Sequence, residues 1–255
     1  MTLAIMQARL TSKRLPGKVL KVINGKPMIY WQLKRIQKAK TVKNCVVAIS
    51  SSDSDNELAE YLESIDAMVV RGSLNDVKSR FDDVLQKYPA SEFIRLTADC
   101  PLIMPDLIDD IVTEFKSLNL DYVSNTLEPT YPDGLDIEVV RSSSFLSLDP
   151  GKLSKIDKEH VTFAMYSTSD RFSIKNFKND VDLSHMRWTV DYQEDLDFVR
   201  EVYDYFQNSE LEFNMSNVLS LLASESNLKN KIDGNRRNES LKKMLSDIGF
   251  KGNDD

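Results

Sequence analysis

The sequence is poor in the residues that build most zinc and dinucleotide sites. It has two cysteines and two histidines in 255 residues and no CxxC pair, which argues against a zinc site. Its eight glycines form neither a GxGxxG nor a GxxxxGK[ST] sequence, which disfavours a dinucleotide-binding fold and a P-loop nucleotidase. Any metal would therefore need oxygen ligands.

Disulfide frameworks and long apolar runs are missing too. Cys45 and Cys100 lie far apart in apolar segments, as buried reduced thiols do, so we expect a cytoplasmic protein. Residues 2–8 are too short for a secretion signal, and no apolar stretch is long enough to span a bilayer. We therefore expect no membrane partner.

Acidic residues are absent from the first 40 positions, which hold ten Lys and Arg. The other residues hold 23 basic and 40 acidic side chains, and the formal net charge is −7. An acidic total argues against a nucleic-acid partner, because a phosphate backbone recruits an excess of Lys and Arg. The basic start of an acidic chain is the feature that needs an explanation.

Strand and helix patterns alternate along the first half of the chain. Short apolar runs indicate buried strands at 3–8, 45–49, 67–70, 93–96 and 122–124. Apolar residues at helical spacing indicate helices at 27–38, 56–64, 77–88 and 105–117. This alternation predicts an α/β fold with a mostly parallel sheet covered by helices on both faces, and a ligand at the carboxyl ends of its strands.

The pattern changes after Asn125. Turn residues at 131–134 precede an alternating segment, 135–140, which predicts an exposed-edge or antiparallel strand in an inserted substrate-binding element. A further strand near 187–190 and a helix at 194–206 follow. We expect one domain over residues 1–225 and a polar extension over 226–255.

The loop after the first strand holds four cations in ten residues: Arg9, Lys13, Arg14 and Lys18. Guanidinium and ammonium groups can clamp a nucleotide triphosphate and stabilise charge that develops during transfer. A solvated basic loop is the alternative, but the position after the first strand favours a phosphate site.

Two aspartates follow expected strands, where they could hold Mg²⁺ over the phosphates of a nucleotide. Asp99 comes after the fourth strand and Asp191 after the strand near 187–190. Helix capping is the alternative for both.

A second group of residues suits the binding of a sugar substrate. Strand alternation puts Asp136 and Glu138 on one face, where they would bind sugar hydroxyls or a second metal, or form an exposed acidic edge. His160 either faces the substrate or is an ordinary surface or core histidine. We assign a substrate-binding role to Asp133, Asp136, Glu138, His160 and Arg187.

Seven segments, in order over the first 205 residues, match a known family. They are Gln7–Arg9 with Arg14–Leu20, Gly25–Met28, Arg71–Ser73 with Asp76–Val77, Asp99–Ile103, Tyr131–Asp136, Glu159–Thr162, and Leu183–His185 with Arg187–Asp191. In these segments the chain resembles the SpsF-like branch of the cytidylyltransferases, named for a spore coat polysaccharide biosynthesis protein. That branch is related to acylneuraminate and Kdo (3-deoxy-manno-octulosonate) cytidylyltransferases.

The resemblance implies a GT-A-like nucleotidyltransferase fold, often dimeric, that transfers CMP from CTP to a sugar and releases pyrophosphate. It implies Mg²⁺ held by Asp99 and Asp191, while the strand pattern leaves Glu138 open as the second ligand instead. The implied nucleotide-binding residues are Gln7 and Ala8, as part of the base pocket, Arg9, Arg14 and Lys18, and Arg71 and Asp76 in a segment that closes over the nucleotide. Of these, Arg9 and Lys18, with Asp99, would be catalytic.

The sequence departs from the family at two positions beside the phosphates, where Lys13 replaces a usual Thr and Ala98 a frequent Gly. We expect an acidic sugar of the nonulosonic type, used for a surface polysaccharide. Two alternatives stay open: a glycosyltransferase of the same fold that uses a nucleotide sugar, and a non-catalytic nucleotide-binding protein. Asp99 is followed by Cys100-Pro101 rather than completing a DxD, which places the glycosyltransferase second.

Overall fold

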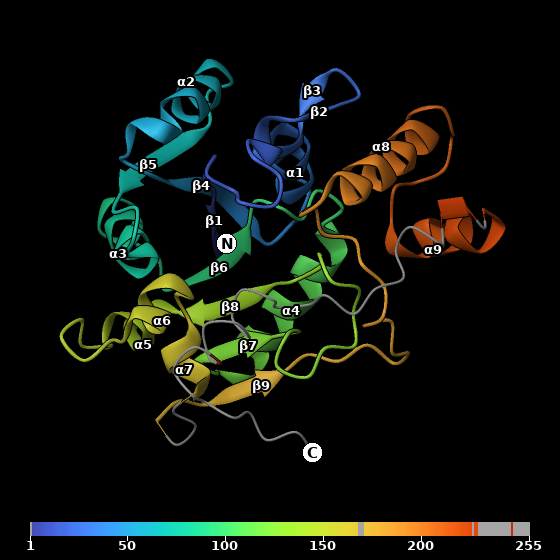
Figure 1. The fold of residues 1–255 in the computed structure, drawn as a ribbon. Coiled ribbons are helices and arrows are strands. Elements are labelled where there is room, and N and C mark those ends of the chain that lie inside the picture. The colour runs from blue at the N-terminus through green and yellow to red at the C-terminus, as the bar shows by residue number, and fades with distance from the viewer. Residues whose placement is uncertain (1, 168–170, 226, 229–245, 247–255) are drawn as a thin grey trace.

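The computed structural model describes residues 2–167, 171–225, 227, 228 and 246. A seven-stranded sheet with the order β5-β4-β1-β6-β8-β7-β9 runs through its centre (Figure 1). The strands are β1 (Thr2–Gln7), β4 (Val42–Ser50), β5 (Met68–Gly72), β6 (Glu92–Thr97), β7 (Tyr122–Ser124), β8 (Glu138–Arg141) and β9 (Ile174–Asn176). A small hairpin pairs β2 (Val22–Ile23) with β3 (Lys26–Pro27).

Helices cover both faces of the sheet. One apolar core lies under α1 (Met28–Ile36), α2 (Asn56–Ser64), α4 (Pro105–Leu118), α8 (Gln193–Gln207) and α9 (Met215–Ser224). The other lies under α3 (Val77–Lys87), α5 (Ser142–Leu146) and the turns of α6 (Lys155–Glu159) and α7 (Phe163–Ser167). Two 3₁₀ turns, η1 (Lys18–Leu20) and η2 (Asp53–Asp55), follow β1 and β4. The predicted α/β class is confirmed.

The predicted strands and helices of the first half are confirmed, because their apolar patterns match their burial. Ile5, Val46 and Phe93, on three neighbouring strands, face one core, while Met6, Val47 and Ile94 face the other. A parallel strand buried on both faces has to be apolar at successive positions, which is the pattern that the sequence shows.

The inserted region differs from its prediction in two respects. β8 is antiparallel, as predicted, but it lies between β6 and β7 and is not an edge strand. Residues 187–190 form no strand, because the amides of Trp188 and Val190 donate to the carbonyl oxygens of Asp133 and Asp99 in two loops. The expected extension over 226–255 lies almost wholly outside the described residues.

The topology marks one crevice for a ligand. From β1 the chain moves outward through β4 to β5, and then returns to place β6 on the opposite side of β1. Such a reversal opens a crevice at the carboxyl ends of the two strands concerned. The basic loop follows β1 there, and Asp99 follows β6. Across the described residues, no helix combines the length and hydropathy needed to cross a membrane.

Gly134 allows two loops to pass at close range. Its φ is +109°, and an added Cβ would lie 2.4 Å from the Thr189 nitrogen and 2.6 Å from the Trp188 carbonyl carbon. Gly25 also has a positive φ, of +75°, but a Cβ there would meet nothing within 4 Å. Both glycines therefore have a φ that is unfavourable for any other residue, but only Gly134 lacks the space for a Cβ atom.

We expect Gly134→Ala to lower the free energy of unfolding by about 3 kcal/mol or more, since backbone atoms have to move. Gly25→Ala, the matched control, should cost about 1 kcal/mol from its φ alone. Chemical denaturation of both variants measures the difference. Equal losses would show that the close approach of the two loops contributes nothing to stability.

Candidate active site

The basic loop after β1 is fixed to the body of the protein. Leu15 and Val19 are buried in the core, and Gly17, with a φ of +68°, begins the 3₁₀ turn that starts at Lys18. The Leu10 amide donates to the buried carboxylate of Asp55 at 2.7 Å. This anchoring directs Lys18 into the crevice, while Arg9 and Lys13 stay exposed.

Lys18 lies between the two predicted metal ligands. Its Nζ donates to Asp99 at 2.9 Å, to Asp191 at 2.8 Å and to the Val190 carbonyl oxygen at 2.9 Å. Burial alone would lower the pKa of Lys18, but the attraction of both carboxylates outweighs it and raises that pKa. Lys18 of the basic loop therefore joins Asp99 and Asp191, which come from distant segments, at one buried ammonium group.

Asp99 is ionised at neutral pH. Burial would raise its pKa, but the Lys18 ammonium and the Thr97 hydroxyl, which donates at 2.6 Å, lower it to about 2. The Thr189 hydroxyl and the Val190 amide donate to the Asp99 backbone carbonyl oxygen at 3.1 and 2.8 Å. Hydrogen bonds thus hold both the side chain and the backbone of Asp99 in place. Asp99 does not cap α4, whose N-cap is Met104.

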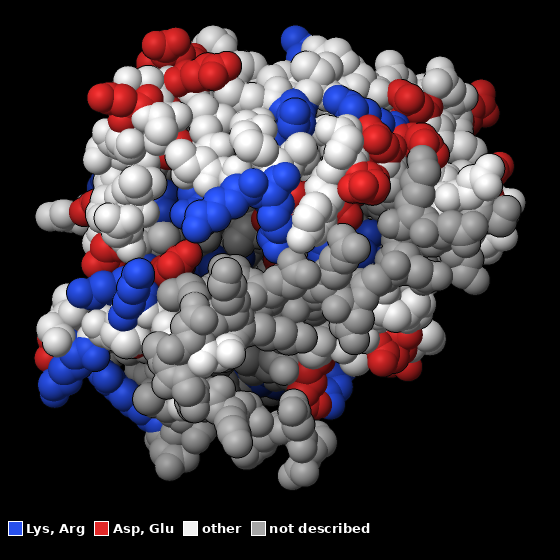
Figure 2. All heavy atoms as spheres, in the orientation of Figure 1, with Lys and Arg blue, Asp and Glu red and all other residues white. Residues whose placement is uncertain are grey.

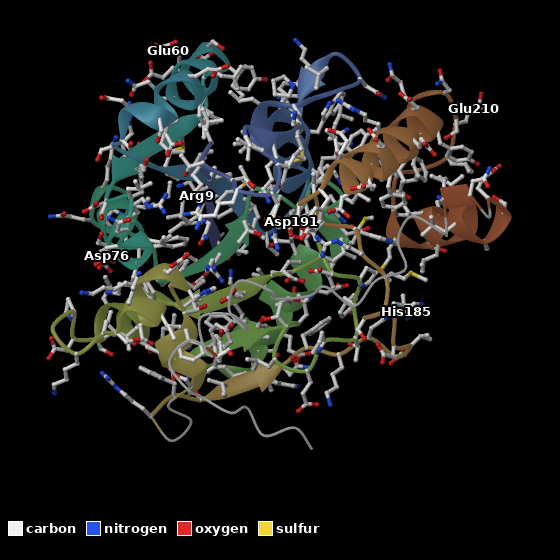
Figure 3. The ribbon with its side chains drawn as sticks, in the orientation of Figure 1. Arg9, Glu60, Asp76, His185, Asp191 and Glu210 are labelled. Carbon is white, nitrogen blue, oxygen red and sulfur yellow. The ribbon has the colours of Figure 1, made fainter. Side chains whose placement is uncertain are left out.

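Asp191 accepts from three cations. Lys18 contacts one oxygen, while Arg14 at 2.6 Å and Arg187 at 2.9 Å contact the other. Burial would raise the pKa of Asp191, but the Lys18 ammonium, with Arg14, lowers it below its usual value. Figure 3 shows Asp191 and Arg9 toward the middle of the molecule, where the loops from both halves converge.

Arg187 is a buried arginine that forms ion pairs with three aspartates and so orients the loop that carries Asp191. Besides Asp191 it pairs with Asp133 at 2.9 Å and with Asp195 at 3.0 Å, and Asp195 also accepts from the amides of Asp191 and Tyr192. Arg187 is 6% exposed. In this structure Arg187 and Asp133 therefore fix the position of Asp191, and the sugar-binding role assigned to both stays a prediction.

A second buried pair lies beside Gln7. Arg95 of β6 donates to Gln7 at 3.2 Å and pairs with Glu138, which also accepts from Tyr122 at 2.9 Å and from Thr162. Glu138 is 8% exposed, so the suggestion of an exposed acidic edge is wrong. Sequence reasoning missed Arg95, although a charge inside the apolar run Phe93–Leu96 was a signal for it.

His160 and Asp136 approach from the inserted region. Burial first, and then the charge of Arg95, lowers the pKa of His160, and its Nε2 is buried with no hydrogen-bond partner among the described residues. The next residue, Val161, has a φ of +52°, which is strained for a β-branched residue. Burial first, and then the charges of Asp99 and Asp136, raises the pKa of the Cys100 thiol.

The remaining predicted nucleotide residues lie around β4, β5 and α3. Arg71 donates to the Ser50 carbonyl oxygen at 3.1 Å and to Asn56 at 2.7 Å, and Asp76 caps α3 by accepting from the Ser79 amide at 2.9 Å. Arg9 and Lys13 are exposed, and the Ala8 amide donates to Ala48. Lys and Arg side chains gather over the middle of this face in the space-filling view, with most acidic residues further out (Figure 2).

The two predicted metal ligands fit Mg²⁺ that arrives with a nucleotide. Throughout the part of the chain that is described, no three His, Cys, Asp or Glu side chains gather as a metal site. Mg²⁺ is commonly held by one or two carboxylates together with substrate phosphates, however, and Asp99 and Asp191 already share one cation. Glu138 instead contacts Arg95, Tyr122 and Thr162, so Asp191 is the better partner for Asp99.

Known proteins resemble this chain in sequence and in fold. The spore coat polysaccharide biosynthesis protein SpsF of Bacillus subtilis is 29% identical over 214 residues, which cover 79% of this chain and 85% of SpsF. The solved structure of a cytidylyltransferase from Leptospira borgpetersenii has a TM-score of 0.83 at 26% identity and covers 92% of this chain and 98% of its own.

A third match concerns the fold alone. The structure of CMP:2-keto-3-deoxy-manno-octonic acid synthetase complexed with CTP has a TM-score of 0.60 at 18% identity and covers 81% of this chain and all of its own.

The sequence model of one family, described as cytidylyltransferase, matches residues 3–236. That span is most of the chain and contains every candidate site residue, which confirms the resemblance: the chain belongs to the cytidylyltransferase family and is a nucleotidyltransferase enzyme.

Proposed function

We propose that the protein transfers CMP from CTP to a sugar hydroxyl group and releases pyrophosphate. The observation that supports this best is the Lys18 ammonium between Asp99 and Asp191, at the crevice where the basic loop ends. A triphosphate bound at this point would meet the cations of the loop on one side and, on the other, two ionised carboxylates that could hold Mg²⁺. Cations on both sides of the phosphates would neutralise the charge that develops during transfer.

The reaction needs no covalent intermediate with the protein. The hydroxyl oxygen of the acceptor bonds to the α-phosphorus while the bond to the oxygen that bridges the α- and β-phosphates breaks. Pyrophosphate leaves with that electron pair, and the hydroxyl proton passes to solvent. Lys18, Arg9 and Arg14 would bind the phosphates and neutralise the charge that builds up on the leaving group.

Mg²⁺ held by Asp99 and Asp191 would supply further charge neutralisation at the α-phosphate. The ion pair with Arg187 keeps Asp191 opposite Asp99, and the hydrogen bond from the Thr97 hydroxyl keeps the Asp99 carboxylate oriented. Arg14 and Lys18 are salt-bridged to Asp191, and the phosphates of CTP compete for the same two cations. Binding of CTP would therefore free carboxylate oxygens as it occupies the crevice.

The acceptor that we propose is an acidic sugar of the nonulosonic type, used for a surface polysaccharide. SpsF is named for polysaccharide biosynthesis, and the structural neighbour with CTP is named for a keto-deoxy sugar acid, which supports this choice. Asp133, Asp136, Glu138, His160 and Arg187 are the residues that we propose bind this acceptor. We further propose a cytoplasmic homodimer that has no nucleic-acid partner.

Pyrophosphate release tests the proposed activity. Incubated with CTP, Mg²⁺ and a panel of acidic sugars, the protein should release pyrophosphate with at least one sugar, and chelation of Mg²⁺ should stop the release. Transfer from a nucleotide sugar without pyrophosphate release would identify a glycosyltransferase instead. Nucleotide binding without turnover of any sugar would favour a non-catalytic protein.

Asp99→Asn tests the proposed metal ligand. Since the pKa of Asp99 is lowered to about 2, the substitution removes a negative charge at every assay pH. We expect a loss of turnover of at least about hundredfold, with the fold retained in circular dichroism. Asp106→Asn, at an exposed position in the first turn of α4, should keep full turnover. Wild-type rates for Asp99→Asn at saturating Mg²⁺ would remove Asp99 from the reaction.

Lys18→Met tests the phosphate contact. The variant should raise the KM for CTP and lower kcat, together reducing kcat/KM by at least about hundredfold, because Lys18 contacts phosphates that carry the developing charge. Lys38→Met, at an exposed lysine beyond the end of α1, is the matched control and should behave like the wild type. An unchanged kcat/KM for Lys18→Met would contradict the phosphate role.

A further inference from the structure

Arg80 is a buried arginine that the proposed reaction does not use. It lies one turn into α3 and is 2% exposed. Gly72, the last residue of β5, makes room for it, since a Cβ at Gly72 would lie 2.8 Å from the Arg80 Cγ. An arginine is rarely buried to this extent without a carboxylate or phosphate partner.

The guanidinium group lies at the carboxyl end of β4, directly beside β1. Arg80 Nη1 donates to the Ala48 carbonyl oxygen at 3.2 Å, and the Ala8 amide donates to the same oxygen at 3.1 Å. Asp99 follows β6, on the opposite side of β1. Two strand spacings, together about 10 Å, therefore separate the end of β4, where Arg80 lies, from the end of β6, where Asp99 meets Lys18. Arg80 thus lies to one side of the phosphate site.

Most of the donors of Arg80 have no acceptor in the described part of the protein. Nη1 makes the one hydrogen bond given above, and Nε is buried without a partner. The two carboxylates whose charges act on Arg80 already accept hydrogen bonds from other groups: Asp55 from Leu10 and Ser50, and Asp76 from Ser79. Burial first, and then the charge of Arg9, lowers the pKa of Arg80 to about 10, which reflects a cation short of acceptors.

We infer that Arg80 reads the pyrimidine ring of the nucleotide, donating to the O2 and N3 acceptors of cytosine. This inference rests on the proposed function. A guanidinium group offers donors and no acceptor. Cytosine presents lone pairs at O2 and N3, whereas uracil carries a hydrogen at N3 that would face another donor. Arg80 is therefore the residue that selects CTP over UTP.

The position of Arg80 favours a base over a phosphate as its ligand. The cations that suit the triphosphate, Lys18 and Arg14, lie with Asp191 on the other side of β1. Between that point and Arg80 stands the backbone of Gln7 and Ala8, at the end of β1. A nucleotide whose phosphates lie at Lys18 would extend its ring past this backbone toward Arg80.

Binding of CTP and UTP, measured by calorimetric titration with Mg²⁺ and without an acceptor, tests the inference. The wild type should bind CTP at least about tenfold more tightly than UTP. Arg80→Lys keeps the charge but loses the fork of donors, and Arg80→Met loses both. We expect each variant to bind the two nucleotides with affinities within about threefold of each other. Thermal melting checks that the variants are folded.

Lys78→Met is the matched control, because Lys78 is a second buried cation of α3. It is 3% exposed, but it pairs with Asp82 at 2.8 Å and lies 4.7 Å over the ring of Phe145. This variant should keep the preference for CTP.

Two results would overturn the inference while leaving the proposed function intact. Folded Arg80 variants could keep the wild-type preference for CTP, or they could lose affinity for CTP and UTP by the same factor, as a phosphate contact would. A wild-type protein that binds neither nucleotide would overturn the proposed function itself, and the role of Arg80 with it.

Discussion

The buried ammonium of Lys18 is the contact on which the geometry of the crevice depends. It joins the loop after β1 to Asp99 after β6 and to Asp191 in the loop before α8. Removing one partner of such a buried ionic cluster costs about 3–5 kcal/mol, because a charge is left without compensation. The loops that the ammonium holds together come from positions more than 170 residues apart. Stability and the proposed function therefore depend on the same atoms here.

The charges around this contact explain the unusual first segment of the chain. Two of its ten basic residues, Arg14 and Lys18, pair with acids from distant segments, whereas others, such as Lys38 and Lys40, are exposed. The acids that pair with Arg14 and Lys18 come from later segments, since no acidic residue lies within the first 40. At the crevice, part of the separation of charge along the sequence is thus removed in space. What remains is a local excess of positive charge beside the crevice, suited to one small polyanion.

The sequence predicted the sheet well, and it placed Lys18 and Asp99 at one edge of that sheet, because both features depend on local patterns. Asp99 and Lys18 each follow a buried strand, and parallel topology brings such positions to one edge. The other contacts could not be predicted, since they depend on register between distant segments. Glu138 meets Arg95 across two antiparallel strands, and Arg187 meets Asp133 across two loops. Residues 187–190 look like a strand because polar and apolar side chains alternate there, but their hydrogen bonds go to loops.

The place of β8 in the sheet has a consequence for motion. Because β8 hydrogen-bonds to both β6 and β7, the half of the sheet expected to bind the acceptor is continuous with the half expected to bind the nucleotide. Enzymes that close around two substrates often do so by rotating one lobe about a hinge. A single uninterrupted sheet offers no such axis. Continuous pairing across the sheet therefore favours closure by the loops above it over rotation of one half against the other.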